Sequence, residues 1–212
     1  MNRPNDSRPQ DGHSSTAPDR HSALLLIDLQ NDYFPGGTLG VPDAQELIPT
    51  INRVIGHFSR NGWAILATRD WHPANHCSFN EQHGSLPVHC VQGSKGAQFH
   101  SALVLPPGMM VISKGTLPKQ DSSSCFEESS LEERLEDLHV NTLWILGLGT
   151  TECLKKTVAD ACRLQLRTIV LSDAMKTYRT SPQCRIDLFQ EIKEIGAALL
   201  SVKELSIPAN LA

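Results

Sequence analysis

The chain has 212 residues, of which 40% are hydrophobic and 20% are charged, and its formal net charge is −4. This length can bury one sizeable core but is short for two full domains. No stretch reaches the ~18 apolar residues of a membrane span and no basic run offers a footprint for nucleic acid, so we expect neither partner. Residues Met1–His21 lack the apolar segment of a secretory signal, and the six cysteines form no C-x-x-C pair, which favours a reduced, cytoplasmic protein.

The predicted elements begin after a polar N-terminal segment. Residues 1–21 contain no Leu, Ile, Val, Phe, Trp or Tyr, so we interpret them as a disordered tail. We expect one domain over residues 22–206 and a short C-terminal tail over residues 207–212. Within the domain, six apolar runs have the length of buried strands. These runs are Ala23–Ile27, Ala64–Ala67, Met109–Ile112, Thr142–Leu146, Thr168–Leu171 and Ala197–Val202.

Segments with helical patterns separate most of these runs. Apolar residues recur at helical spacing in Ala44–Arg60, and similar patterns follow in Leu131–Leu138, Glu152–Leu166 and Pro182–Ile195. This alternation implies parallel β-α-β units, and the predicted class is α/β: a three-layer α/β/α fold with a six-stranded parallel sheet. The exception is Trp71–Pro107, a long irregular segment that contains five of the nine histidines. A loop of this length in a compact domain is usually functional.

Residues with catalytic or metal-binding chemistry follow the first four apolar runs. They are Asp28 after the first run, Asp70 and His72 after the second, Lys114 after the third, and Gly149 and Cys153 after the fourth. An open parallel sheet binds its ligands beyond the carboxyl ends of its strands. The sequence therefore predicts a site that combines a carboxylate, a metal-binding pair, an amine and a thiol at one edge of the sheet.

Cys153 is the candidate nucleophile, because the first turn of a helix stabilises a thiolate. Asp28 and Lys114 would supply the base and the orienting group that a nucleophile needs. Gly149 would allow a tight turn that aims backbone N–H groups at one point, as an oxyanion hole requires. Each side chain also has an ordinary alternative: a small core cysteine, a helix cap or a surface lysine. The other cysteines are interpreted as buried or incidental: Cys77, Cys90, Cys125, Cys162 and Cys184.

The histidine-rich segment indicates a metal site. Asp70 and His72 can offer an oxygen and a nitrogen to one ion, and ordinary polar loop residues are the alternative. Further potential ligands in the same loop are His76, Glu81, His83 and His89. The lack of a C-x-x-C pair disfavours a structural zinc finger. Mixed oxygen and nitrogen ligation fits a catalytic divalent ion, with Zn²⁺ preferred and Mn²⁺ or Fe²⁺ as the alternatives.

Taken in order, the motifs of this chain resemble the nicotinamidase branch of the isochorismatase-like cysteine hydrolases. The motifs are LLLIDLQNDYFPGG, ATRDWHPANHCSF, LPVHCVQGSKGAQFH, VISKGT with DSSSCF, and GLGTTECLKKTVADA. No single motif is specific, but their order across Ser22–Val202 is. The resemblance implies a Rossmann-like six-stranded parallel sheet between helix layers. It also implies a catalytic triad of Asp28, Lys114 and Cys153.

The resemblance assigns further site residues. The implied metal ligands are Asp70, His72 and His89, with His76 or Glu81 as the nearest candidate for a fourth. The implied oxyanion hole consists of the backbone N–H groups of Gly149 and Cys153, with a cis peptide bond before Gly149.

Two departures from the family pattern affect the expected substrate pocket. Members usually carry Trp at the position of Leu86 and often carry Tyr at that of Ser123. These positions line the pyridine pocket of the family beside that of Phe34. The candidate substrate-binding residues are therefore Phe34, Leu86 and Ser123, in a pocket that has lost one large wall and one phenol.

The predicted function is a metal-dependent cysteine amidohydrolase that converts nicotinamide to nicotinate and ammonia in NAD salvage. In this hypothesis the metal positions the small-molecule substrate, Cys153 attacks the amide carbon and Asp28 transfers protons. One alternative is a related amidase or ureido-hydrolase that acts on another small amide, which Leu86 and Ser123 favour. The other is a catalytically inactive binding homologue, which the intact triad disfavours. The sequence does not distinguish a monomer from a homo-oligomer.

Overall fold

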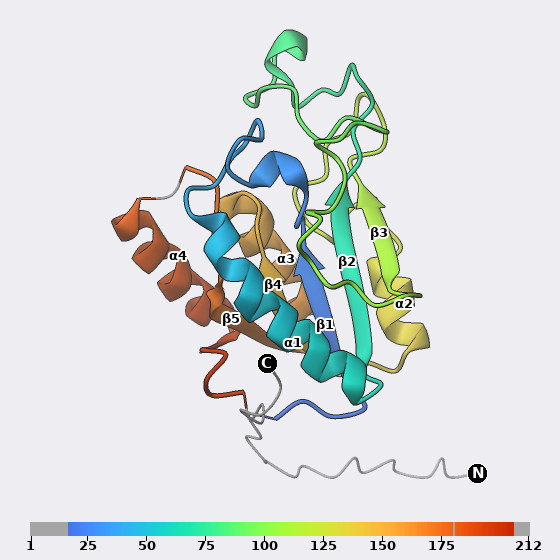
Figure 1. Ribbon diagram of the computed structural model, residues 1–212, viewed down its shortest axis with the longest axis vertical. Coiled ribbons are helices and arrows are strands. Elements are labelled where there is room, and N and C mark those ends of the chain that lie inside the picture. Colours follow the sequence, from blue (N-terminus) through green and yellow to red (C-terminus); the bar gives the residue numbers. More distant parts are fainter. Residues whose placement is uncertain (1–16, 180, 206–212) are drawn as a thin grey trace, which may run out of the picture.

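The computed structural model describes residues 17–179 and 181–205 (Figure 1). The last residues of the predicted N-terminal tail are among them and form a turn. The Asp19 carboxylate accepts hydrogen bonds from the His21 N–H (3.0 Å) and from Ser22 Oγ (2.9 Å), and the first strand begins there. The rest of that predicted tail and the predicted C-terminal tail, residues 207–212, lie outside the described residues.

The described chain is built around a six-stranded sheet in which all strands are parallel, as predicted. The strands are β1 (Ser22–Ile27), β2 (Ala64–Asp70), β3 (Met110–Lys114), β4 (Thr142–Gly147), β5 (Arg167–Met175) and β6 (Ala198–Leu200). Their spatial order is β3-β2-β1-β4-β5-β6. The chain therefore builds one half of the sheet outward from β1 and then returns to build the other half from β4. This places the topological switch point between β1 and β4, where open α/β sheets bind their ligands.

Four α-helices cover the two faces of the sheet. They are α1 (Ile48–Arg60), α2 (Leu131–Asp137), α3 (Thr151–Arg163) and α4 (Pro182–Ile195). Leu24 and Leu26 of β1 pack in one core cluster with α1, whereas Ala23 and Leu25 pack in the other with α2, α3 and α4, because successive strand residues point to opposite sides. Figure 1 shows α1 in front of the sheet and α3 behind it. The predicted three-layer α/β/α class is confirmed.

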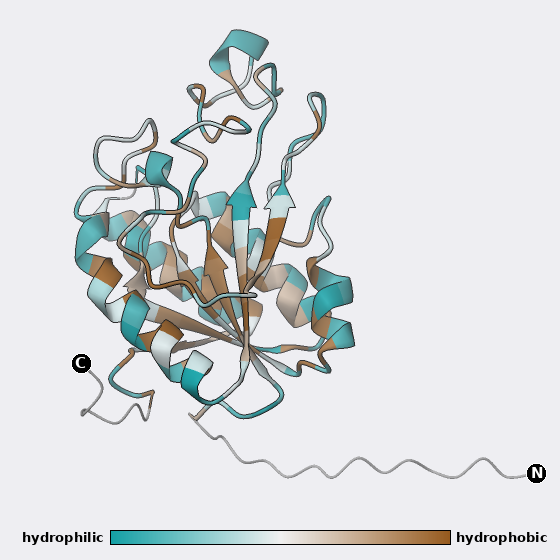
Figure 2. Ribbon diagram, turned by 45° about the vertical axis from the view of Figure 1, so that its right-hand side comes forward, coloured by the Kyte–Doolittle hydropathy of each residue, from teal (hydrophilic) through white to brown (hydrophobic). Residues whose placement is uncertain are grey.

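The bounds of several elements differ from the sequence prediction. The predicted helix Ala44–Arg60 is divided into a 3-10 turn, Ala44–Leu47, and α1. Pro49 lies in the first turn of α1 and has no N–H with which to continue an α-helical ladder backwards. β2 and β3 extend beyond their apolar runs, so Asp70 and Lys114 are the last residues of these strands. Figure 2 shows hydrophobic strands with polar tips at β2 and β3.

The first part of the long connection between β2 and β3 lies at the carboxyl edge of the sheet, and its last part runs back to the start of β3 (Figure 1). Its one regular element is a short 3-10 helix, Asn80–Gln82. The loop after β1 holds this segment in place. The side-chain amide of Gln30 donates to the carbonyls of Asp70 (2.7 Å) and Ala97 (3.0 Å), and the Asp32 carboxylate accepts the backbone N–H of Cys90 at 2.7 Å.

None of the helices in the described ranges is long and apolar enough to cross a membrane.

Candidate active site

A cavity of about 340 Å³ lies at the carboxyl edge of the sheet and collects the residues that follow β1 to β4. Its lining includes Asp70, His72, His89, Lys114 and Cys153. These residues come from β2, the long connection, β3 and the start of α3. With Tyr33 from the loop after β1, the sheet topology brings together side chains that are up to 120 positions apart in the sequence, at the switch point of the fold.

A buried ion-pair network of Asp28, Lys114 and Asp70 forms one wall of this site. Lys114 Nζ lies 2.9 Å from Asp28 Oδ2 and donates a hydrogen bond to Asp70 Oδ1. Asp70 and Lys114 are register partners at the ends of β2 and β3, and all three side chains are almost completely buried. Removing a buried charge from such a network is strongly unfavourable, so each carboxylate depends on the single amine between them.

The network has different effects on its two carboxyl groups. Burial raises the pKa of Asp28 to about 6, although Lys114 acts in the opposite direction. Burial also disfavours ionisation of Asp70, but Lys114, His72 and His89 together hold its pKa well below the usual range. Burial likewise disfavours the charged form of Lys114, yet the two carboxylates raise its pKa. Asp70 is therefore a permanent anion, whereas Asp28 can exchange a proton near neutrality.

The backbone of Asp28 has an unusual conformation. Its φ is 45°, in the left-handed region that residues with a side chain rarely adopt. Thr68 Oγ1 donates to Asp28 Oδ1 at 2.8 Å and accepts the Asp28 N–H at 3.3 Å, which fixes the carboxylate at the end of β1. Backbone strain of this kind concentrates at functional sites, where the surrounding structure maintains it.

Cys153 is the third residue of α3 and is 6% exposed. Thr150 precedes the helix, and its Oγ1 accepts the Cys153 N–H at 3.2 Å as an N-cap. A hydrogen bond with Cys125 and burial raise the pKa of the Cys153 thiol, while Lys114 acts to lower it. Cys153 therefore rests as the thiol, and it would need a base such as Asp28 to act as the predicted nucleophile.

The structure changes part of the expected oxyanion hole. The described residues contain no cis peptide bond, so the expected cis bond before Gly149 is not found; the trans form is the default for a non-proline residue by about 3 kcal/mol. The Cys153 N–H is used by the Thr150 cap. Gly149 has a φ of 138°, and a Cβ there would lie 3.7 Å from Asp28 Oδ2, so its backbone is close to the base. The pairing of Gly149 and Cys153 as donors stays a prediction.

Asp70, His72 and His89 form a cluster that could hold a metal ion, with their ligand atoms within 4.8 Å of one another. His72 Nε2 lies 3.8 Å from Asp70 Oδ1, and His89 Nε2 lies 4.0 Å from Asp70 Oδ2. His72 Nδ1 donates to the carbonyl of Gly115 (2.9 Å) and His89 Nδ1 to that of Pro87 (2.8 Å). A carbonyl can only accept, so the Nδ1 atoms are the donors, and the Nε2 atoms that face Asp70 are the nitrogens available to a metal ion.

The protonation of this cluster also fits a metal site. Burial lowers the pKa of His72 to about 4 and outweighs the opposing effect of Asp70. A neutral imidazole and an ionised carboxylate are the forms that bind divalent ions. The set of one oxygen and two nitrogens suits Zn²⁺ with open positions for further ligands.

The two candidates for a fourth ligand do not join the cluster. His76 is buried and stacks on His72 with ring centroids 4.1 Å apart, but its Nδ1 pairs with Ser78 Oγ (2.8 Å) and its Nε2 with the carbonyl of Gln120 (3.1 Å). Glu81 is exposed on the 3-10 helix Asn80–Gln82. His76 therefore supports the ring of His72 rather than offering a free nitrogen.

The three candidate substrate-binding residues differ in position. Leu86 and Ser123 line the cavity, but Phe34 is absent from its lining. The Phe34 ring is buried against His100, with ring centroids 4.3 Å apart. Its neighbour Tyr33 lines the cavity instead, because consecutive residues of this loop point in different directions. Phe34 is therefore not among the residues that line this cavity, and its role in substrate binding stays a prediction.

Tyr33 is the main site residue that the sequence analysis missed. Its hydroxyl donates to Asp70 Oδ2 at 2.6 Å, and its ring meets that of His89 edge to face, with centroids 6.3 Å apart. Burial and the nearby carboxylates raise the pKa of Tyr33, so it remains a donor. The one feature of the sequence that could have indicated Tyr33 was its place in the NDYF motif after β1.

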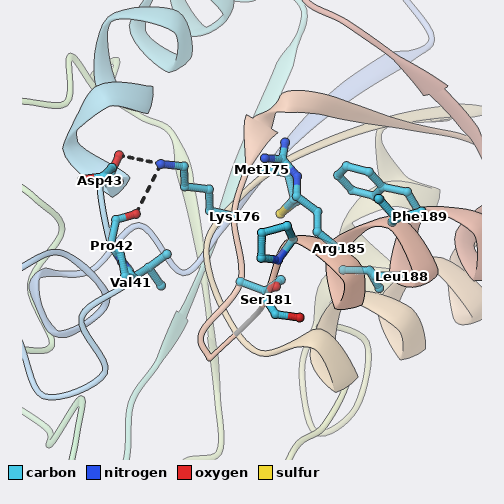
Figure 3. A pocket seen from close by; sticks show the side chains of 12 residues that line it. Val41, Pro42, Asp43, Met175, Lys176, Ser181, Arg185, Leu188 and Phe189 are labelled. Atoms are coloured by element: carbon cyan, nitrogen blue, oxygen red, sulfur yellow. Dashed lines mark hydrogen bonds between the residues drawn. The ribbon is translucent and has the colours of Figure 1, made fainter.

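A second, larger cavity of about 490 Å³ lies between the loop before α1, the end of β5 and α4 (Figure 3). Lys176 Nζ donates to the carbonyls of Pro42 (3.2 Å) and Asp43 (2.9 Å) on one side, and Arg185 lies over the ring of Phe189 on the other. Its lining contains no cysteine or histidine. The smaller cavity is lined by the Cys153 thiol, the metal-binding cluster and Lys114, which pairs with Asp28 behind the lining, and it is therefore the candidate active site.

Residues 22–204 match the Isochorismatase domain. The protein belongs to the isochorismatase family. The family resemblance of its ordered motifs is thereby confirmed, and the parallel sheet has the expected family fold.

Two solved structures and one sequence relative place the chain within the isochorismatase family. It is 37% identical over 203 residues to a nicotinamidase of Escherichia coli (strain K12), covering 86% of this chain and 95% of the relative. The pyrazinamidase of Pyrococcus horikoshii in complex with zinc has a TM-score of 0.81 and 37% identity, covering 85% of this chain and 99% of that chain. PnC1 from L. infantum in complex with nicotinate has a TM-score of 0.78 and 32% identity, covering 87% and 94%.

Proposed function

We propose that this protein is a nicotinamidase, which hydrolyses the amide of nicotinamide to nicotinate and ammonia. The observation that carries the proposal is the placement of Cys153, Lys114 and the Asp70–His72–His89 cluster around one cavity, with Asp28 paired to Lys114. Relatives and structural neighbours named as nicotinamidases or pyrazinamidases support it. The proposed compartment is the cytoplasm, where reducing conditions suit six free cysteines.

Asp70, His72 and His89 would hold the divalent ion, for which we propose Zn²⁺. When bound there, the ion supplies a positive anchor for the ring nitrogen of the substrate. The chain prepares this anchor by keeping Asp70 ionised and His72 neutral, and by using the Nδ1 atoms of both histidines in hydrogen bonds to carbonyls. The anchored ring would present its amide to Cys153 in a fixed orientation.

Asp28 and Cys153 would carry out the acylation. Asp28 takes the thiol proton, and the Cys153 sulfur attacks the amide carbon to form a tetrahedral intermediate. The backbone N–H of Gly149 is the proposed donor to its oxyanion. Asp28 then returns the proton to the leaving nitrogen, ammonia departs and a thioester remains. The raised pKa of Asp28 makes it a better proton acceptor than an ordinary aspartate, while Lys114 keeps it ionised at neutral pH.

The same residues would release the product. A water molecule replaces ammonia, and Asp28 takes one of its protons as its oxygen attacks the thioester carbon. The C–S bond breaks, nicotinic acid leaves and loses its own proton to solvent as nicotinate, and the proton held by Asp28 returns to Cys153 as a thiol. One base thus serves both half-reactions.

A related amide is the second candidate substrate, because the cavity wall is more polar than the family pattern implies. Ser123 Oγ accepts a hydrogen bond from Lys156 Nζ (2.7 Å) and donates one to the Glu127 carboxylate (3.0 Å). With Leu86 in place of a large aromatic, this wall could accept an amide or ureido compound with a polar substituent.

A substrate-panel assay separates the two candidates. The purified, metal-loaded protein is given nicotinamide, pyrazinamide and several small ureido compounds, and ammonia release is measured. The proposal expects the largest kcat/KM with nicotinamide. Cleavage of a ureido compound with no cleavage of nicotinamide would replace the proposed substrate. Leu86→Trp is the matched variant, and it should favour the flat pyridine amides over larger compounds.

A further inference from the structure

A second thiol lies directly behind the proposed nucleophile. Cys125 is completely buried in a turn before α2, and its backbone N–H donates to Thr157 Oγ1 at 2.9 Å. Cys153 Sγ lies 3.9 Å from the same Thr157 Oγ1, one helical turn along α3. Thr157 Oγ1 thus contacts both the Cys125 backbone and the Cys153 sulfur, and each thiol shifts the pKa of the other. The proposed amidase reaction uses only one of these two sulfurs.

The two sulfurs differ in their access to solvent. Cys153 lines the active-site cavity, whereas Cys125 is not part of the lining. Cys125 Sγ points to the Thr68 hydroxyl, 3.7 Å away on β2. A small neutral oxidant that enters the cavity therefore meets Cys153 first. An oxidised form of Cys153 would have Cys125 beside it, because both residues contact Thr157 Oγ1.

We propose that Cys125 is a resolving cysteine, which forms a reversible disulfide with Cys153 when hydrogen peroxide enters the active site. In the first step the Cys153 sulfur attacks a peroxide oxygen. An S–O bond forms, the O–O bond breaks, and hydroxide leaves and takes up the thiol proton as water. The sulfur is oxidised by two electrons to a sulfenic acid, and the peroxide is reduced.

In the second step the Cys125 sulfur attacks the sulfenic sulfur of Cys153. An S–S bond forms, the S–O bond breaks, and hydroxide leaves with the Cys125 proton as a second water. Burial opposes ionisation of Cys125, whereas Lys114 and the Thr157 hydroxyl act to lower the pKa of its thiol. Cys125 lies in a turn and not in a helix or strand, so its backbone can adjust to disulfide geometry while α3 holds Cys153.

The consequence is protection of the nucleophile. A sulfenic acid without a resolving thiol is oxidised further to a sulfinic acid, which ordinary thiol reductants do not reverse. A disulfide removes the nucleophile only until a reductant restores both thiols. The pair would therefore make inactivation by peroxide reversible.

The test treats the metal-loaded protein with hydrogen peroxide and then with dithiothreitol. The amidase activity of the wild type should fall by about tenfold or more and return after reduction. Tryptic digestion without reductant should yield residues 120–134 linked to residues 135–155, which carry Cys125 and Cys153 respectively. The linked species should be about 2 Da lighter than the two separate peptides, for the loss of two hydrogens.

Variants test the role of the second thiol, each compared with its own untreated activity. Cys125→Ala and Cys125→Ser should lose activity that dithiothreitol does not restore, and peptide 135–155 should gain about 32 Da as the sulfinic acid. Cys162→Ala is the matched control on α3 and should recover like the wild type. Full recovery of both Cys125 variants, or peptides 120–134 and 135–155 that remain unlinked in the wild type, would overturn the proposal. The peptide readout needs no substrate, so it is independent of the proposed nicotinamidase activity.

Discussion

Lys114 Nζ lies 2.9 Å from Asp28 Oδ2, although Asp28 follows β1, Lys114 ends β3, and β2 lies between these two strands. The same amine also binds the Asp70 carboxylate. One buried cation thus connects the proposed base to the proposed metal site. The pairing couples the two halves of the site, since neither carboxylate has another cationic side chain at ion-pair distance among the described Lys and Arg residues.

The first prediction concerns stability. Lys114→Met leaves two buried carboxylates without their cation and should lower the free energy of unfolding by about 3–5 kcal/mol. Urea denaturation of the metal-free protein measures the change. Lys155→Met is the matched control, because Lys155 forms a partly exposed pair with Glu191 at 2.6 Å, and its loss should lower the free energy of unfolding far less. Equal effects of the two substitutions would contradict the buried network.

The second prediction concerns pH. Because burial raises the pKa of Asp28 to about 6, the carboxyl group is protonated and unable to act as a base below that pH. The kcat/KM for the substrate should therefore fall as pH decreases through about 6, by about tenfold for each further unit. A pH profile of metal-loaded enzyme tests this. An acid limb near pH 4, the ordinary range of an exposed aspartate, would show that Asp28 is not the titrating base.

The third prediction separates two buried histidines. His72→Ala removes an Nε2 that faces Asp70 and should reduce bound metal by about tenfold or more. His76→Ala is the matched change, because both ring nitrogens of His76 already have partners, and it should keep most of the metal. Elemental analysis after dialysis measures both. Equal metal loss in the two variants would mean that His76 is also a ligand.

The fourth prediction concerns Tyr33. Tyr33→Phe removes the hydroxyl that donates to Asp70 Oδ2 but keeps the ring against His89. A group that orients a metal ligand typically contributes 10–100-fold to affinity, so we expect metal binding to weaken by about tenfold while the fold is retained. A competition titration with a chelator gives the affinity. Unchanged affinity would limit Tyr33 to lining the cavity.

The strands and the polar residues at their carboxyl ends were the predictable part of this protein. Six apolar runs and four helical patterns gave the α/β class, because hydrophobic periodicity reports directly which side chains are buried. The residue at which a strand ends was harder to predict from the sequence. Thr68 and Asp70 continue β2 beyond the apolar run because backbone pairing with β3 stabilises the strand there, whatever the polarity of the side chains.

The directions of loop side chains could not be obtained from the sequence. Tyr33 faces the cavity and Phe34 the core because tertiary hydrogen bonds, such as that from the Cys90 N–H to Asp32, position the loop after β1. His76 looked like a potential ligand by type and spacing, yet its nitrogens are taken by Ser78 and Gln120, and Gln120 is 44 residues away. Such contacts form only when the whole chain is folded.

The most direct test of the central claim is ammonia release from nicotinamide by the wild type and by Cys153→Ala, both with metal content measured first. Because the substituted residue is not a metal ligand, both proteins should contain equal metal. The account predicts that the wild type releases ammonia and that Cys153→Ala loses at least about 10³-fold in kcat. Ammonia release by a metal-loaded Cys153→Ala protein at the wild-type rate would contradict the assignment of Cys153 as the nucleophile.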